Sequence, residues 1–171
     1  MTQFFFESEL DDAIVQRKKV LRIYFITLAV YLAISVGFIV YFCTLPYASE
    51  KITTVKVLHH VLTGMYAIFS LIYLGIAYKR VNSYCKLLNN LKTGLKETSV
   101  GSFFEYDETI QNKEGVDCKA LIFLQWNKYK NEYFERKVLV LNEKEYPEFK
   151  EQQTLKYVTQ GNVLVSYEIE E

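Results

Sequence analysis

The two histidines of the chain, His59 and His60, are adjacent in the sequence and precede a long apolar segment. Successive residues on a helix point about 100° apart, whereas two imidazoles that bind one metal from a single helix are normally three or four residues apart. The nearest other ligand types along the chain are Glu50 and Cys43, and neither completes a site. We therefore expect a structural pair at the outer rim of a membrane span, with metal or haem binding across copies and a pH response as alternatives.

Other reactive groups are neighbouring carboxylates in the C-terminal half, at Asp107-Glu108 and at Glu143 with Glu145. Lysines stand close to them, which is typical of a solvated surface. The same half has no histidine, no glycine-rich phosphate loop and no serine nucleophile motif. Because a general base or metal site needs residues that are mostly missing, we predict no enzyme activity, no catalytic residue, no bound metal and no cofactor.

The formal charge of zero hides two unlike halves. Residues 1–98 contain 11 basic and 6 acidic residues, and residues 102–171 contain 9 basic and 14 acidic ones. Binding to a nucleic-acid polymer requires a positive footprint that neutralises phosphates, so the acidic half is not expected to bind one. The two halves are expected to face different surroundings.

The basic half contains two uncharged runs, 27 residues between Arg22 and Glu50 and 22 residues between Lys56 and Lys79. About 20 helical residues cross the hydrocarbon core of a bilayer, so both runs are long enough to span it. We predict a membrane α-helical hairpin, integral to a plasma or inner membrane. Its parts are an N-terminal segment with a helix start (1–19), a first span (20–43), an external loop (44–56), a second span (57–78) and a basic juxtamembrane helix (79–100).

The distribution of basic residues around the runs predicts the orientation. Arg17, Lys18 and Lys19 precede the first span, and Lys79, Arg80, Lys86, Lys92 and Lys96 follow the second, whereas the loop between the spans contains only Lys51 and Lys56. Under the positive-inside rule both termini are cytoplasmic. The juxtamembrane helix is expected to end near Thr93-Gly94 or at Ser99 to Gly101.

Small residues recur on both spans at positions where another helix could approach closely. The candidate helix-packing residues are Ala29, Ala33, Gly37, Gly64, Ala67 and Gly75. Packing of the hairpin on itself and contact with another copy are both compatible with this pattern.

The acidic half, residues 101–171, reads as an all-β cytosolic domain. Turn signals divide it into five runs that alternate between apolar and polar residues or are apolar throughout: Ser102–Gln111, Val116–Trp126, Glu132–Leu141, Thr154–Thr159 and Asn162–Ile169. Gly161 supplies the positive φ that a tight hairpin needs. Five short strands predict a small barrel or sandwich of SH3-like or OB-like type.

Two classes of function are compatible with this plan, in addition to a structural or immunity-type subunit of a larger membrane complex. The first is a membrane anchor, adaptor or regulatory protein whose β-domain binds a protein partner or assembles with other copies. Its candidate surface comprises Trp126, Tyr129, Tyr133 and Phe134. The second is a ligand-gated effector, because the order of parts resembles the two-transmembrane-plus-β-domain effectors of bacterial cyclic-oligonucleotide antiviral systems. That resemblance lies in the plan of the chain, and it implies a small-molecule ligand such as a cyclic nucleotide and hairpins that oligomerise to permeabilise the membrane.

Overall fold

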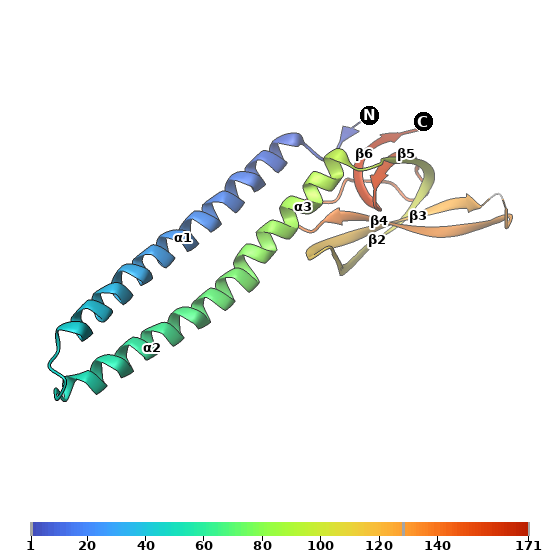
Figure 1. Ribbon diagram of the computed structural model, residues 1–171. Coiled ribbons are helices and arrows are strands. Elements are labelled where there is room, and N and C mark those ends of the chain that lie inside the picture. Colours follow the sequence, from blue (N-terminus) through green and yellow to red (C-terminus); the bar gives the residue numbers. More distant parts are fainter. Residues whose placement is uncertain (1, 128, 171) are drawn as a thin grey trace. The chain divides into compact units, whose positions relative to one another are not determined.

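The computed structural model describes residues 2–127 and 129–170 (Figure 1). Contacts divide the chain into two compact units, a helical unit of residues 15–82 and a β-unit made from residues before 15 together with residues from 83 onward.

The helical unit is built from two long apolar helices that form a hairpin (Figure 1). Helix α1 is Glu7–Thr44, helix α2 is Lys51–Ile72, and the helix continues through a π-helical segment, η1, at Tyr73–Tyr78 into α3 at Lys79–Thr93. Both helices are long and apolar enough to cross a membrane, and only 6% and 0% of their most apolar windows are buried within the chain. A core helix of a water-soluble protein would be mostly buried, so length, composition and exposure all favour a bilayer as the surrounding medium.

Aromatic and hydroxyl side chains join the two helices of the hairpin. The rings of Tyr31 and Tyr66 stack with centroids 4.2 Å apart, and the Tyr31 hydroxyl donates a hydrogen bond of 3.1 Å to Thr63. Further along the pair, the Tyr73 hydroxyl donates to the Val20 carbonyl oxygen at 3.1 Å. Aromatic stacking and hydrogen bonds donated by tyrosine hydroxyl groups therefore join these helices at the described contacts.

The β-unit contains a closed five-stranded mixed barrel. Its strands are β2 (Glu97–Lys113), β3 (Val116–Asn127), β4 (Glu132–Leu141), β5 (Thr154–Gln160) and β6 (Val163–Ile169). The five strands expected from the sequence are confirmed, with β2 longer than its predicted run. A short strand that was not expected, β1 (Thr2–Gln3), pairs with β6.

The strand order closes the barrel through one long connection. Strands β2, β3 and β4 form successive antiparallel pairs, and the chain then returns so that β5 pairs with β2. Strand β6 lies antiparallel to β5 and meets β4 in parallel at Leu139 and Val163. Three consecutive strands followed by a fourth that lies beside the first make a Greek key.

The hairpin turns follow the predicted turn chemistry. Gly161 has φ +55° and Asn162 φ +70° between β5 and β6, and Glu114 and Gly115 have φ +54° and +85° between β2 and β3. Two consecutive residues at positive φ are typical of the type I′ turns that match the twist of a β-hairpin. The prediction of a positive φ at Gly161 is confirmed.

Two hydrophobic clusters occupy the two sides of the barrel strands. One cluster contains Leu121, Phe123, Val138, Val140 and Tyr157, and the other contains the alternate residues Cys118, Ala120, Leu139 and Leu141. The second cluster also includes Leu10 and Ala13 of α1 and Leu87, Leu88 and Leu91 of α3. Because successive side chains of a strand point to opposite faces, central strands that are apolar on both faces can serve both clusters.

The N-terminal segment is part of the β-unit. The Phe4 and Phe5 amides both donate to the Val165 carbonyl oxygen, at 2.9 and 3.1 Å, and Phe5 is buried. Lys144 binds the Phe4 carbonyl oxygen and the Glu9 carboxylate, the latter at 2.7 Å. Residues before the first span thus provide both a strand and the first turns of α1 to the core of this unit.

The segment 79–100 divides between two elements. Helix α3 ends at Thr93, one of the two ends expected, and the Gly94 amide donates to the Asn90 carbonyl oxygen at 2.8 Å. Strand β2 begins at Glu97, so Val100 pairs with Lys156 of β5 and is not helical. Residues 97–100, which the local pattern assigned to the helix, are strand residues because they pair with β5.

Candidate functional site

The aromatic residues named from the sequence belong to the hairpin of β3 and β4, and Figure 1 labels the two strands. Trp126 and Tyr133 are directly opposite each other across the two strands, and their rings meet edge to face with centroids 4.9 Å apart. Trp126 is 49% exposed and Tyr133 66% exposed. Phe134 and Tyr129 are exposed as well, although Phe134 follows Tyr133 in the strand and therefore points to the opposite face.

The residues around this aromatic pair order the end of the hairpin. The Asn127 side-chain oxygen accepts hydrogen bonds from the amides of Tyr129 and Lys130, at 2.9 and 3.3 Å. The Asn131 amide donates to the Asn127 carbonyl oxygen at 2.9 Å, and Asn131 has φ +52°. The strands that carry the exposed rings of Trp126 and Tyr133 are therefore joined by a hydrogen-bonded turn, which limits the entropy that this end of the hairpin loses on binding.

Arg136, two residues beyond Phe134, ties β4 to β2. Its guanidinium donates two hydrogen bonds to Glu97, of 3.1 and 2.8 Å, and one to the Ser99 hydroxyl of 2.8 Å. The Arg136 side chain is 14% exposed and that of Glu97 66% exposed. Hydrogen bonds from Arg136 lower the pKa of Glu97, and the same bonds raise the pKa of Arg136. This fork holds the start of β2, immediately after α3, against the barrel.

Tyr157 lies under this guanidinium without a partner for its hydroxyl. The Arg136 guanidinium carbon is 6.0 Å from the centre of the Tyr157 ring, and the ring stacks on Phe123 at 4.4 Å. No described residue forms a hydrogen bond with the buried Tyr157 hydroxyl. Burial raises the pKa of Tyr157 to about 12, so the hydroxyl stays protonated at neutral pH.

The connection from β4 to β5, residues 142–153, is fastened by two tyrosines. The Tyr106 hydroxyl donates to the Pro147 carbonyl oxygen at 2.9 Å and accepts from the Phe149 amide at 2.8 Å. The Tyr146 hydroxyl donates to the Asp107 carbonyl oxygen at 3.0 Å. The Phe149 ring packs against Phe103 with centroids 5.4 Å apart, so the connection contributes a ring to one of the hydrophobic clusters of the barrel.

The carboxylate pair Asp107-Glu108 lies on β2, with the Asp107 side chain 14% exposed and Glu108 exposed. The Asp107 carboxylate accepts hydrogen bonds from Lys137 at 2.9 Å and from the Thr109 amide at 3.0 Å. Hydrogen bonds from Thr109 and from Lys137 lower the pKa of Asp107 to about 2. A carboxylate so strongly held in its charged form is a poor general base near neutral pH.

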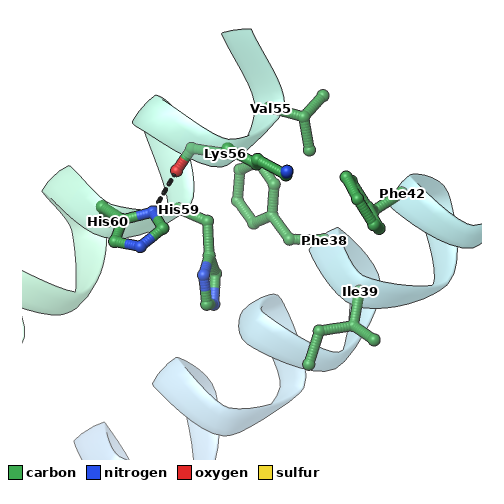
Figure 2. A pocket seen from close by; sticks show the side chains of 7 residues that line it. All are labelled: Phe38, Ile39, Phe42, Val55, Lys56, His59 and His60. Atoms are coloured by element: carbon green, nitrogen blue, oxygen red, sulfur yellow. Dashed lines mark hydrogen bonds between the residues drawn. The ribbon is translucent and has the colours of Figure 1, made fainter. Parts of the chain in front are cut away.

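His59 and His60 lie in a cavity of the helical unit, of about 190 Å³ (Figure 2). The lining residues are Phe38, Ile39 and Phe42 of α1 and Val55, Lys56, His59 and His60 of α2, which together form what we call the histidine pocket. Val55 and His59, and likewise Lys56 and His60, are four residues apart, so the two members of each pair lie one turn apart on α2. The Lys56 ammonium lies 5.4 Å from the centre of the Phe42 ring, and the His59 ring lies 5.9 Å from that of Phe38.

The two imidazoles have different environments. His60 Nδ1 lies 2.6 Å from the Lys56 carbonyl oxygen (Figure 2). Because a carbonyl oxygen can only accept, Nδ1 is the donor. His59 Nε2 is shielded and has no hydrogen-bond partner among the described residues. The two rings are nearly perpendicular, at 82°, with centroids 6.2 Å apart. Sequence reasoning placed the pair at a rim but did not join it to Lys56 and to the aromatic residues of α1.

A second cavity, of about 320 Å³, lies in the β-unit. Its lining residues are Gln3, Phe5, Glu7, Lys92, Lys96, Val158, Val165 and Ser166. Lys92 donates a hydrogen bond of 3.0 Å to Glu7, so the start of α1 and the end of α3 meet at its edge. The sequence did not indicate this cavity, because its residues come from four separate segments.

The six candidate helix-packing residues, Ala29, Ala33, Gly37, Gly64, Ala67 and Gly75, are all exposed within the chain. A Cβ atom added at Gly37, Gly64 or Gly75 would meet no atom of the described residues within 4 Å. The structure thus shows no close contact of the hairpin with itself at these three glycines, and contact with another copy stays a prediction. Within residues 2–127 and 129–170, no group of three or more His, Cys, Asp or Glu side chains is placed to hold a metal ion.

Comparisons with protein-family models, with curated proteins and with solved structures found no match for this chain. The class of molecule is accordingly defined by its own architecture, two exposed apolar helices of membrane length joined to a closed five-stranded β-barrel.

Proposed function

We propose that this chain is an integral membrane adaptor or regulatory protein whose β-barrel binds a protein partner. The observation that carries the proposal is the exposed pair of Trp126 and Tyr133 on the β3–β4 hairpin. Tryptophan and tyrosine dominate the binding energy of protein interfaces because they bury a large, rigid area at a small cost in entropy. The proposal assigns no catalytic residue and no cofactor.

The OB-like assignment, in preference to the SH3-like one, is part of the same proposal. It is supported by the Greek-key order in which β5 returns beside β2 and β6 closes the barrel against β4. In OB folds the second and third strands commonly form the binding face. Here those strands are β3 and β4, which carry Trp126 and Tyr133. Analogy of fold supports the place of binding and does not identify the partner.

The test is a comparison of two variants in the native membrane. We expect affinity purification of the wild-type chain to recover a protein that is lost with Trp126→Ala/Tyr133→Ala. The matched control is Ile110→Ala, because Ile110 is an exposed apolar residue of β2 outside the aromatic surface. Recovery of the same proteins with all three chains would exclude the aromatic surface as the binding site.

The proposal places the chain in the plasma or inner membrane with both termini in the cytoplasm. Support comes from the basic residues that flank the spans and from the exposure of the two apolar helices. A cysteine introduced by Ser49→Cys in a Cys43→Ser background should react with a membrane-impermeant maleimide in intact cells. Glu170→Cys in the same background should react only after permeabilisation. The reverse pattern would overturn the orientation.

A ligand-gated membrane effector is a second candidate, favoured by the cavity beside Lys92 and Lys96. Two lysines and one carboxylate, Glu7, give its rim a net positive charge although the domain as a whole is acidic. A small anion bound there would contact the beginning of α1 and the end of α3 together. Leakage of a dye from vesicles on addition of a cyclic nucleotide, abolished by Lys92→Gln/Lys96→Gln, would support this function over the first.

A further inference from the structure

The histidine pocket combines an apolar wall with a single charged group. Phe38, Ile39, Phe42 and Val55 form the wall, and Lys56 is the one charged residue among the seven that line the pocket. No carboxylate lines it, so the Lys56 ammonium has only the face of the Phe42 ring as a partner in the described chain. The Lys56 ammonium would attract an anionic group of a ligand, and the apolar wall beside it would favour an apolar group of the same ligand.

His59 points to the same kind of ligand. Its Nε2 atom is shielded from solvent and has no hydrogen-bond partner among the described residues. Leaving a shielded polar atom unpaired is costly, and a ligand oxygen in the pocket would satisfy it. Figure 2 shows His59 and Lys56 both projecting from α2 toward the residues of α1.

The bilayer itself contains molecules with this combination of groups. The surrounding helices expose apolar residues such as Ile39 and Val57, which a bilayer would cover with acyl chains. A water-soluble anion would leave the aromatic wall unused, whereas a phospholipid places an acyl chain beside its phosphate. A zwitterionic headgroup adds an ammonium or choline cation that Lys56 would repel, so a lipid with net negative charge fits better.

We infer that the histidine pocket binds an anionic phospholipid, with the headgroup phosphate at Lys56 and His59 and an acyl chain against Phe38 and Phe42. This inference rests on the membrane location proposed above but not on the choice of partner or ligand for the β-barrel. In this site His59 forms a polar contact with the lipid and does not bind a metal. Lys56 selects lipids of net negative charge over zwitterionic ones.

The experiment is native mass spectrometry of the full chain in detergent, titrated with phosphatidylglycerol or with phosphatidylcholine of the same acyl chains. We expect phosphatidylglycerol to bind more tightly to the wild type, and Lys56→Gln to weaken that binding about fivefold. Lys51→Gln is the matched control, because Lys51 is a cation at the start of the same helix that does not line the pocket. Equal losses in Lys56→Gln and Lys51→Gln would show a general attraction of charge and overturn the site.

Two substitutions at His59 distinguish a polar contact with the lipid from a side chain that only fills space in the pocket. His59→Gln keeps a hydrogen-bonding group and should retain most of the phosphatidylglycerol binding, whereas His59→Leu keeps the volume, removes the polar atom and should weaken binding. Equal binding by the two variants, or equal affinity of the wild type for both lipids, would overturn the proposal. Carbonate extraction of cell membranes tests the membrane location separately, because release of the wild type there would refute the location whatever the lipid titration shows.

Discussion

Lys144 and Glu9, which are 135 positions apart in the sequence, form a hydrogen-bonded ion pair of 2.7 Å in the β-unit. Glu9 belongs to the first turn of α1, and Lys144 lies in the connection that follows β4. Lys144 also binds the Phe4 carbonyl oxygen, and its ammonium lies 5.0 Å from the centre of the Phe4 ring. One lysine thus joins the N-terminal segment to the C-terminal half of the chain.

Lys144→Met should therefore destabilise the β-unit. The carboxylate of Glu9 is largely buried, its Oε2 atom already has no partner among the described residues, and the substitution would leave the other oxygen unpaired as well. We expect a loss of about 2–3 kcal/mol in the free energy of unfolding, measured by thermal or denaturant unfolding in detergent. The control is Lys130→Met, whose pair with Glu132 is 3.8 Å long and exposed on both sides and should cost under about 0.5 kcal/mol. Equal effects would contradict a structural role for Lys144.

Removal of the hydroxyl groups of Tyr157 and Tyr106 should have opposite effects on stability. The Tyr157 hydroxyl is buried without a partner, so Tyr157→Phe should raise the free energy of unfolding by about 1 kcal/mol. The Tyr106 hydroxyl makes two hydrogen bonds to the β4–β5 connection, so Tyr106→Phe should lower it by a similar amount. The measurement is the melting temperature of each variant compared with that of the wild type. A decrease in both variants would mean that the Tyr157 hydroxyl has a hydrogen-bond partner in solution.

The lowered pKa of Asp107 predicts that the free energy of unfolding decreases in acid. Its pKa in the folded chain is about 2, below the ordinary value of 3.8, so the folded state binds this proton less readily than the unfolded state. The stabilisation is present above the unfolded pKa of 3.8 and is lost progressively as the pH falls through the folded pKa of about 2. Asp107→Asn should therefore flatten the decline of the melting temperature between pH 4 and pH 2. Glu108→Gln, which changes the adjacent carboxylate and leaves the Lys137 contact in place, should preserve the slope seen in the wild type.

Gly37 offers a test of assembly through the helices. Because a side chain at this position meets no other atom of the described chain within 4 Å, Gly37→Leu should not disturb the hairpin itself. If copies pack along the small residues, the variant should shift the chain toward monomer in size-exclusion chromatography with light scattering. Val36→Leu adds bulk at the exposed neighbouring position on another face and should leave assembly unchanged. The same oligomer from all three chains would refute packing along this stripe.

The sequence by itself determined those features that depend on local pattern. Long uncharged runs give helices because a backbone in an apolar medium must satisfy its own hydrogen bonds, and apolar alternation between turn signals gives the strands. The two apolar helices, the five barrel strands and the positive φ of Gly161 were predictable for this reason. Trp126 and Tyr133 could be named from the sequence as part of an aromatic surface, but their contact across two strands came only from the pairing of β3 with β4.

The tertiary structure alone decided the features that depend on contacts between distant residues. Four contacts join segments that share no local sequence signal. They are the pairing of Thr2 with Tyr167, the closure of β6 on β4, the hydrogen bonds between Arg136 and Glu97, and the ion pair of Lys144 with Glu9. The same reason applies to the histidines. Their spacing argued against a metal, but only the packing of α1 against α2 brought His59 and Lys56 to Phe38 and Phe42 and made a pocket of them.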